Sequence, residues 1–245
     1  MKRLIFMLCM VTVIPVFAQK VTWMVHGGPS INTHYSGFSN GSVRFGGRFG
    51  VGMEYQLSHV FSIQPSLMLS FKGNKSTSEI RVMKTTSEST VYKYTKRTWR
   101  YEQTYLEMPV NAQFRLHLRH GNAVTWAVGP YFAYGIGGNT KYSRIVAEST
   151  MHNTDGTTWT EGGDGTQLTE TVSQGGTFSK NGADFCRFDM GINGAVHFEL
   201  KKFMMGLYME EGLMKLDKEH ESNVIVNYLA HNKNFSFGLD LGYRF

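Results

Sequence analysis

The chain has 245 residues, with 27 glycines, 5 prolines, 2 cysteines and a formal net charge of +6. This charge is small and does not gather on one periodic face, so the composition excludes a nucleic-acid-binding surface. Beyond residue 18 no stretch approaches the ~20 apolar residues of a spanning helix, so the chain could cross a membrane only as a β-barrel.

The first residues have the pattern of a secretory signal peptide. A short basic region precedes a mainly apolar stretch at residues 4–16, and small residues then precede a cleavage point after Ala18. We therefore expect residues 1–18 to be a cleaved signal peptide and residues 19–245 to be one domain. Its removal leaves Cys186 as the single cysteine, which excludes an intrachain disulfide and a metal site built on paired cysteines.

Three strands are predicted in the first third of the chain, at residues 20–35, 43–57 and 61–72. In the second of them the odd positions are apolar or glycine, and the even positions are polar or glycine. Successive side chains in a strand point to opposite faces, so this strand has one apolar face and one polar face. The first strand loses this alternation at Gly27, and Pro65 predicts a local irregularity in the third strand.

Five further strands follow with the same alternation, at residues 104–116, 123–136, 185–200, 203–213 and 235–245. The fourth of these five is shorter and less regular than the others. The last strand has an unbroken apolar face formed by Phe235, Phe237, Leu239, Leu241, Tyr243 and Phe245. Eight strands with one apolar face each are typical of a transmembrane barrel, whose apolar residues face lipid.

The connections between these strands fall into two classes of length. Short turns are predicted at residues 58–59, 117–122 and 201–202. The long connections are residues 73–103, 137–183 and 215–234, with one shorter connection at 36–41 on the same side. Outer-membrane barrels have short periplasmic turns and long extracellular loops. The sequence therefore predicts an all-β, eight-stranded antiparallel transmembrane β-barrel in the cell outer membrane.

The polar faces of the strands predict a charged barrel interior. The predicted inward-facing polar network consists of Arg44, Arg48, Glu54, Glu107, Arg115, Arg187, Asp189, His197, Glu199, Asp240 and Arg244, together with Gln64, Lys72, Asn111, Gln113 and Asn193. Because side chains fill the interior of an eight-stranded barrel, we expect a structural polar plug. The alternative is a small porin with a path for ions or solutes.

An enzyme is a second alternative. His197 and Glu199 share the inward face of one strand, and Asp189 lies further along it. Such a histidine and acid could serve a lipid A-modifying barrel enzyme, but no serine stands out as a nucleophile. A soluble, lipocalin-like barrel is a third alternative, which would need its bulky apolar face inside. We therefore predict no catalytic residue, no cofactor and no metal.

The two longest connections differ in charge. Residues 73–103 carry seven Lys or Arg against three Glu, with tyrosines and a tryptophan between them. This segment predicts either a solvated hairpin extension of the barrel or a contact with lipopolysaccharide phosphates. Residues 137–183 place acidic side chains among glycines and threonines; their spacing fits no EF-hand, so a mobile solvated loop is favoured over a calcium site.

Several short motifs resemble one known family. Residues 105–109 (Tyr-Leu-Glu-Met-Pro), 129–131 (Gly-Pro-Tyr), 188–191 (Phe-Asp-Met-Gly), 212–213 (Gly-Leu) and 242–245 (Gly-Tyr-Arg-Phe) occur in the order found in PorT-like outer-membrane β-barrel proteins of Bacteroidetes. The resemblance implies that Phe245, with Tyr243, is an insertion signal read by the barrel assembly machinery. The family includes a component linked to protein secretion. We expect a non-enzymatic outer-membrane protein with an interaction, envelope or secretion-related role, with outer-membrane lipid and lipopolysaccharide around the barrel and a protein partner at the extracellular loops.

Overall fold

The computed structural model describes residues 21–36, 39–40, 42–85, 89–153, 159–162, 168–180, 185–216 and 232–245. The expected signal peptide and its cleavage point at Ala18 lie outside these residues.

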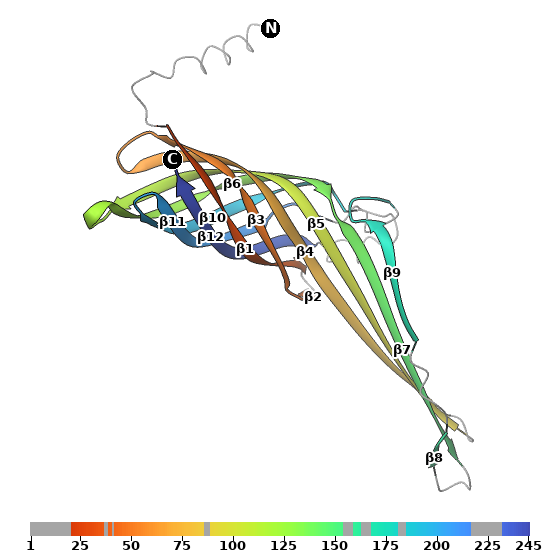
Figure 1. The fold of residues 1–245 in the computed structure, drawn as a ribbon. Helices are drawn as coiled ribbons and strands as arrows, with labels where there is room; N and C mark the ends of the chain where they lie inside the picture. Colours follow the sequence, from red (N-terminus) through yellow and green to blue (C-terminus); the bar gives the residue numbers. More distant parts are fainter. Residues whose placement is uncertain are drawn as a thin grey trace, which may run out of the picture.

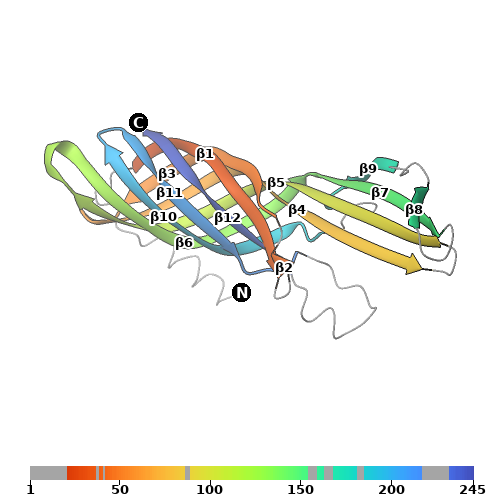
Figure 2. The same ribbon diagram turned by 90° about the horizontal axis from the view of Figure 1, so that it is seen from below.

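Eight strands close into an antiparallel ring (Figures 1 and 2). The ring runs through β1 (Val21–Ser36), β3 (Arg44–Gln56), β4 (Phe61–Thr85), β5 (Ser89–His117), β6 (Asn122–Gly137), β10 (Phe188–Leu200), β11 (Phe203–Gly212) and β12 (Lys233–Arg244). Pairing of β1 with β12, as in Val25 opposite Tyr243, closes the barrel. The predicted eight-stranded barrel is confirmed. The short β2 (Ser39–Asn40) pairs with the end of β1.

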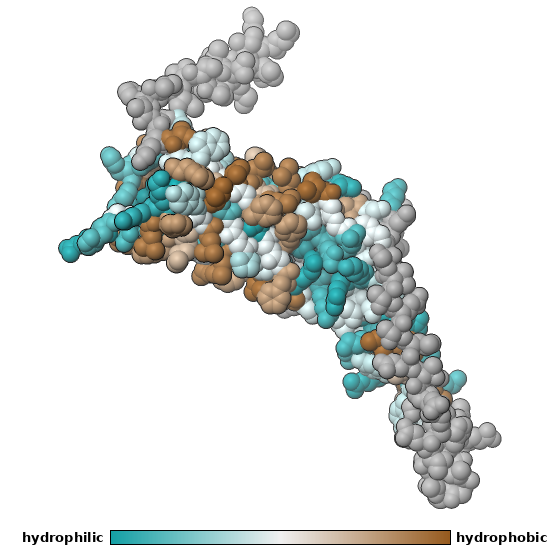
Figure 3. Space-filling view, viewed as in Figure 1, coloured by the Kyte–Doolittle hydropathy of each residue, from teal (hydrophilic) through white to brown (hydrophobic). Residues whose placement is uncertain are grey.

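The lipid-facing surface follows the predicted alternation. In β3 the odd residues Phe45, Phe49 and Val51 are exposed, while Arg48 and Glu54 are buried in the interior. Figure 3 shows apolar side chains gathered across the visible face of the barrel. These large apolar side chains are exposed to the surroundings of an isolated chain, as expected of residues that lipid covers in a membrane.

Pro65 interrupts a ladder without shifting its register. The pairing of β3 with β4 runs as far as Gly52 opposite Ser66 and resumes at Tyr55 opposite Ile63, in the same register. Pro65 lies within this interruption because it has no N–H to donate. The predicted irregularity is therefore local, and β4 continues through it.

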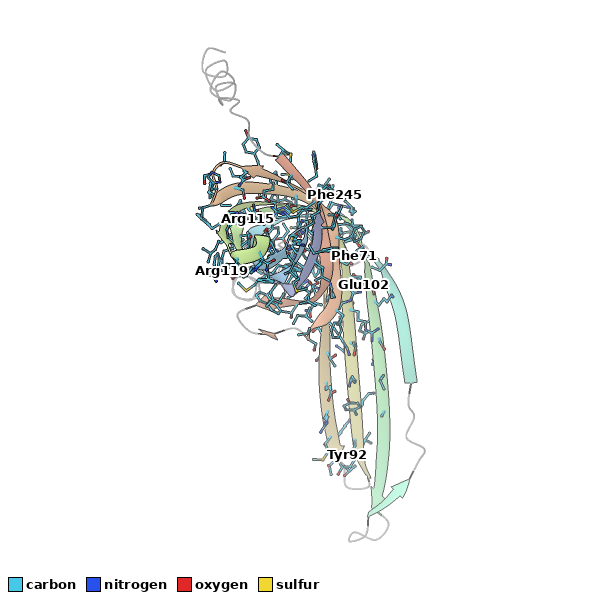
Figure 4. The ribbon with its side chains drawn as sticks, turned by 60° about the vertical axis from the view of Figure 1, so that its left-hand side comes forward. Phe71, Tyr92, Glu102, Arg115, Arg119 and Phe245 are labelled. Atoms are coloured by element: carbon cyan, nitrogen blue, oxygen red, sulfur yellow. The ribbon has the colours of Figure 1, made fainter. Side chains whose placement is uncertain are left out.

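Strands β4 and β5 continue well beyond the barrel as one long hairpin. Outside the barrel β5 also pairs with β7 (Asn139–Asn153), and β7 pairs with β8 (Trp159–Gly162) and β9 (Leu168–Gly176). We call this sheet the blade: the parts of β4 and β5 from residue 74 to residue 101, with β7, β8 and β9. Figures 1 and 4 show the blade projecting from one end of the barrel.

The strands of the blade test the predictions for the two longest connections, residues 73–103 and 137–183. The hairpin extension predicted for residues 73–103 is confirmed. The mobile-loop interpretation of residues 137–183 is wrong for β7, β8 and β9, which are paired strands. Gly73 and Gly138 lie at the base of the blade with φ of 152° and 148°, a conformation that glycine adopts without strain. A Cβ at Gly138 would lie 2.0 Å from the Glu102 carbonyl oxygen, so the strands approach closely there.

The opposite end of the barrel carries the short turns. They join β3 to β4, β5 to β6 through a 3-10 turn (Arg119–Gly121), and β10 to β11 through Lys201 and Lys202. Phe245 lies at this end, where its N–H donates to the Trp23 carbonyl oxygen at 2.9 Å. Figure 4 shows Phe245 far from Tyr92, which lies toward the tip of the blade.

Candidate functional site

A chain of buried ion pairs crosses the middle of the barrel interior. The Lys72 Nζ lies 2.7 Å from a Glu107 carboxylate oxygen and 2.9 Å from a Glu210 carboxylate oxygen. Arg48 contacts Glu210 and donates to the Asp240 carboxylate at 3.2 Å. These five side chains come from β4, β5, β11, β3 and β12 and are almost fully buried. The pairs therefore connect opposite walls of the barrel, and each charge is paired, as burial requires.

Aromatic rings support the two cations of this chain. The Arg48 guanidinium lies 3.3 Å from the centre of the Tyr208 ring, and the Lys72 Nζ lies 4.6 Å from the centre of the Tyr131 ring. Both rings are buried in the interior. A cation over an aromatic face gains more electrostatic stabilisation when both groups are buried than when they are exposed.

Two histidines meet at Asp240. The His26 Nδ1 lies 3.0 Å from one oxygen of Asp240, and the His197 Nε2 lies 3.2 Å from the other. The His26 Nε2 lies 3.2 Å from the Ser66 Oγ. Ser66, His26 and Asp240 therefore have the order of contacts found in a serine nucleophile, base and orienting acid. Asp240 also pairs with Arg48, and Ser66 is only 5% exposed.

A second set of ion pairs fills the end of the interior near the short turns. Arg115 lies 2.9 Å from Glu54 and 3.2 Å from Glu199. Arg244 lies 2.6 Å from Glu199 and also contacts Glu54. Two guanidinium groups and two carboxylates thus alternate in a closed cycle across the barrel. Each carboxylate contacts both arginines, so each of these charges has an opposite charge beside it.

Aromatic side chains fill the other end of the interior, at the base of the blade. Tyr105, Tyr131, Ala133, Phe178, Phe185 and Leu216 form one buried cluster, against which Tyr101 packs. The Tyr131 hydroxyl donates to Asp189 at 3.1 Å, and the Asn234 Nδ2 donates to the same carboxylate at 2.8 Å. The aromatic cluster, the central ion pairs and the arginine–glutamate cycle all lie in the barrel interior.

The structure brings most of the predicted network together. Buried or nearly buried in the interior are Arg48, Glu54, Glu107, Arg115, Asp189, His197, Glu199, Asp240 and Arg244, as are Gln64, Lys72, Asn111, Gln113 and Asn193. Arg44 lies at the base of the blade, where it contacts Glu102 at 3.3 Å.

Arg187 is a correction to the predicted network. It is exposed, and it donates to the Gly135 carbonyl oxygen at 2.8 Å. Arg187 has the same parity as the inward residues Asp189 and Asn193. However, β10 begins at Phe188, so Arg187 lies just before the strand and does not reach the barrel interior.

Several interior residues are absent from the predicted network, among them His26, His34, Tyr208 and Glu210. The His34 Nε2 lies 3.0 Å from the Gln103 Oε1, and the ring packs near Phe185. His26 and His34 belong to β1, whose alternation weakens at Gly27 and Gly28, whereas Tyr208 and Glu210 belong to β11, whose two faces both carry methionines. Residues two apart in a strand point to the same face, so Glu210 and Tyr208 share one face of β11. This spacing is the sequence signal that places both residues on the same side of the barrel wall.

The described residues hold no group of three His, Cys, Asp or Glu side chains that could bind a metal ion. Asp155 and Asp164, two acidic residues of the calcium alternative, lie outside the residues that the structure describes. Within the described part of the chain no helix is long and apolar enough to span a membrane.

Comparisons with known proteins give one family and a set of distant structural likenesses. The model of the family described as "Outer membrane protein beta-barrel domain" matches residues 17–218. No curated protein matches the chain.

Three solved structures illustrate the distant likenesses. The attachment invasion locus protein Ail of Yersinia pestis is 12% identical with a TM-score of 0.40, covering 92% of this chain and 99% of that one. The outer membrane protein OprG from Pseudomonas aeruginosa is 7% identical with a TM-score of 0.37, covering 93% and 97%. Neisserial surface protein A is 8% identical with a TM-score of 0.35, covering 92% and 99%.

The family model spans most of the chain, and the eight ring strands with their apolar outer face are those of a barrel in the outer membrane. The chain therefore belongs to the outer membrane protein beta-barrel domain family.

Proposed function

We propose that this protein is a sealed, non-enzymatic barrel that holds the blade at the cell surface as a platform for an interaction partner. The observation that carries the proposal is the continuity of β4 and β5, which run from the barrel wall into the blade as single strands. Two strands of the barrel wall thereby fix the direction of the blade. A solute channel has no need for such a structure.

The filled interior supports the sealed-barrel part of the proposal. Three successive layers block it: the aromatic cluster, the Lys72 and Arg48 ion pairs, and the arginine–glutamate cycle. In an eight-stranded barrel there is just enough interior for side chains. An open aqueous path would require several of these buried ion pairs to separate.

The distribution of turns supports the orientation. Short turns face the periplasm in outer-membrane barrels, and long connections face outside. The blade grows from the end opposite to the turns at Arg119–Gly121 and at Lys201 and Lys202. We place the blade on the extracellular side.

The motifs at residues 105–109 and 242–245 support a PorT-like branch of the family and an envelope or secretion-related role. In that role the blade contacts a partner protein. Tyr105 and Glu107 of the first motif lie buried in the interior, so this motif builds the barrel and leaves partner choice to the blade.

Cysteine labelling of intact cells tests the proposed display of the blade. In a Cys186→Ser background, one variant carries Met83→Cys in the blade, where Met83 is 65% exposed, and another carries Leu118→Cys at a short turn. A membrane-impermeant maleimide should label the Met83 variant on intact cells and the Leu118 variant only after the outer membrane is opened. The reverse pattern would overturn the orientation, and labelling of neither variant on intact cells would overturn surface display.

A second candidate function is that of a serine hydrolase of the lipid A-modifying type, favoured by the Ser66–His26–Asp240 contacts. With a proton on Nδ1 donated to Asp240, the His26 Nε2 can accept the proton of the Ser66 hydroxyl. A fluorophosphonate probe tests this candidate on the folded barrel. Covalent labelling that Ser66→Ala abolishes would replace the non-enzymatic proposal, whereas an unlabelled wild-type barrel would eliminate the hydrolase.

A further inference from the structure

Three cations stand side by side at the base of the blade. Lys75 of β4 pairs directly with Arg100 of β5, and Arg100 pairs directly with Lys141 of β7. Directly paired residues of neighbouring antiparallel strands point to the same face of the sheet. We call Lys75, Arg100 and Lys141 the cationic row. It crosses three strands on one face.

The cationic row lies on the face that continues the lipid-facing surface of the barrel. On β4 the outward residues alternate through Leu67, Leu69 and Phe71, and Gly73 then contributes no side chain. Lys75 is therefore the first outward side chain of β4 beyond Phe71, about 13 Å further along the strand at ~3.3 Å per residue. Figure 3 shows hydrophilic side chains gathered over β4 and β5 directly beyond the apolar side chains of the barrel.

The protein supplies little compensation for these charges. Glu102 lies just below the row, near Phe71 in Figure 4, and its Oε1 is 3.3 Å from Arg44 and 3.5 Å from Lys141. One carboxylate thus faces four cations, and its ion pairs are with Arg44 and Lys141. Like charges placed directly opposite in a β-ladder destabilise it, so an anion from outside the chain would relieve the row.

Farther from the barrel, the described outward residues of β4, β5 and β7 carry one ion pair and one additional cation. Glu79 pairs with Lys96 at 3.1 Å, and this contact lowers the pKa of Glu79 and raises the pKa of Lys96. Arg81 lies over the Tyr94 ring. The excess positive charge of the outward face is therefore concentrated at the base of the blade, at the height where the apolar side chains of the barrel end.

We propose that the cationic row binds the phosphate groups of the glycolipid that forms the outer leaflet around the barrel. Lys75, Arg100 and Lys141 project from the wall beside the lipid, at the level of its headgroups, and phosphate is the anion that Arg and Lys bind best. Bound phosphates would neutralise the row and fix the height and tilt of the blade above the membrane. This inference rests on the proposed orientation, with the blade outside.

Binding of lipid A to the purified, folded barrel in detergent micelles tests the proposal. The probes are lipid A with both phosphates and the same lipid A after enzymatic removal of its phosphates, and native mass spectrometry counts the bound molecules. The test variant combines Lys75→Gln, Arg100→Gln and Lys141→Gln. The matched control removes three exposed charges elsewhere, through Lys84→Gln, Arg97→Gln and Arg119→Gln.

We expect the wild type and the control to bind the phosphorylated lipid at least tenfold more tightly than the dephosphorylated lipid. Each cation near an anionic surface contributes about fivefold, so the triple variant should lose on the order of 100-fold in affinity for the phosphorylated lipid. Glu102→Gln should change the affinity in the opposite direction and strengthen binding. Equal binding of the two lipids by the wild type, or unchanged binding by the triple variant, would overturn the proposal.

Separate measurements test lipid binding by the cationic row and the orientation of the blade. Maleimide labelling reports the side on which the blade lies, independently of any lipid. If Met83→Cys is labelled on intact cells while the triple variant binds lipid A as the wild type does, the lipid-binding proposal is wrong and the proposed orientation of the blade stands. If labelling places the blade in the periplasm, both the lipid-binding proposal and the proposed function are wrong.

Discussion

Lys72 is the side chain on which the central ion pairs depend. It is 2% exposed and contacts two carboxylates on opposite walls, Glu107 and Glu210. Removing one partner of a buried ion pair leaves an uncompensated charge and costs about 3–5 kcal/mol. We expect Lys72→Met to lower the free energy of unfolding by this amount in urea titrations of the barrel in micelles.

Lys84→Met is the matched control for that measurement, because Lys84 is exposed on the blade and an isolated surface change costs under about 0.5 kcal/mol. Adding Glu107→Gln to Lys72→Met should recover part of the loss, since it removes the carboxylate that is left without a cation, whereas Glu210 keeps its contact with Arg48. A loss below about 1 kcal/mol for Lys72→Met would show that water, and not Lys72, neutralises these carboxylates.

Phe245 combines a small packing role with the insertion signal that the resemblance implies. Its side chain is 68% exposed and its ring centre lies 5.3 Å from that of Tyr243. Deleting it removes at most about 2 kcal/mol of burial. We expect the deletion to lower the yield of heat-modifiable barrel in the outer membrane much more than it lowers the unfolding midpoint. An unchanged yield with a lower midpoint would reduce Phe245 to a packing residue.

Alternation in the sequence predicts correctly which side chains face the interior where the other face of the strand is uniformly apolar. Alternation predicts an interior position for Glu107 and Asp240 because their neighbours at i±1 are bulky and apolar. Alternation does not predict the interior positions of Glu210 and His26. Methionines or glycines flank them on both faces of their strands, so the two faces do not differ clearly in polarity. The contacts between these residues, such as those of His26 with Ser66 and Asp240, depend on the order of strands in the ring and have no signature in any single strand.

At the scale of the element, the register of β3 can be tested by charge. Phe49 lies on the lipid face and Gln56 has the opposite, inward parity. A charge on the lipid face near the bilayer midplane costs about 2–4 kcal/mol. We expect Phe49→Arg to reduce the folded fraction strongly on heat-modifiability gels, with Gln56→Arg close to the wild type. Equal defects would contradict the register.

The choice of control follows from the backbone packing of β3. Gly50 also has inward parity, but a Cβ there would lie 2.0 Å from the Leu67 carbonyl oxygen. An arginine at this position would fail through steric overlap alone. Gln56 is half-buried near the short-turn end and is free of this constraint.

The blade strands show why alternation failed beyond the barrel. Residues 139–153 mix polar and charged residues with scattered apolar ones, so neither face is uniformly apolar. A strand with two mixed faces has no period-two signal. The hairpin of β4 and β5 was still recognisable, since it continues two strands with strong alternation, whereas the pairing of β7 with β5 is a long-range contact that composition does not reveal.

At the scale of the whole molecule, the ring of eight strands and its filling form one mechanical unit. The arginine–glutamate cycle links β3, β5, β10 and β12, and the central ion pairs link β3, β4, β5, β11 and β12. Every ring strand except β1 and β6 contributes to these ion pairs, and those two contribute His26 and Tyr131 to the same interior. The polar interior therefore joins the walls of the barrel as well as filling it.

The proposed sealing of the interior predicts that the protein conducts few ions. In planar bilayers we expect the wild type to show no stable single-channel currents, because both arginines of the cycle and both central cations would have to leave their carboxylates for an aqueous path to open. Replacing the four side chains of the cycle by alanine (Glu54, Arg115, Glu199 and Arg244) opens only the short-turn end, and the central ion pairs should still hold conductance at the baseline. Conductance should appear only when Lys72 and Arg48 are also replaced, provided that the variant still folds on a heat-modifiability gel. Large, stable currents from the wild type would restore the small-porin alternative, since they would require a water-filled path past these ion pairs.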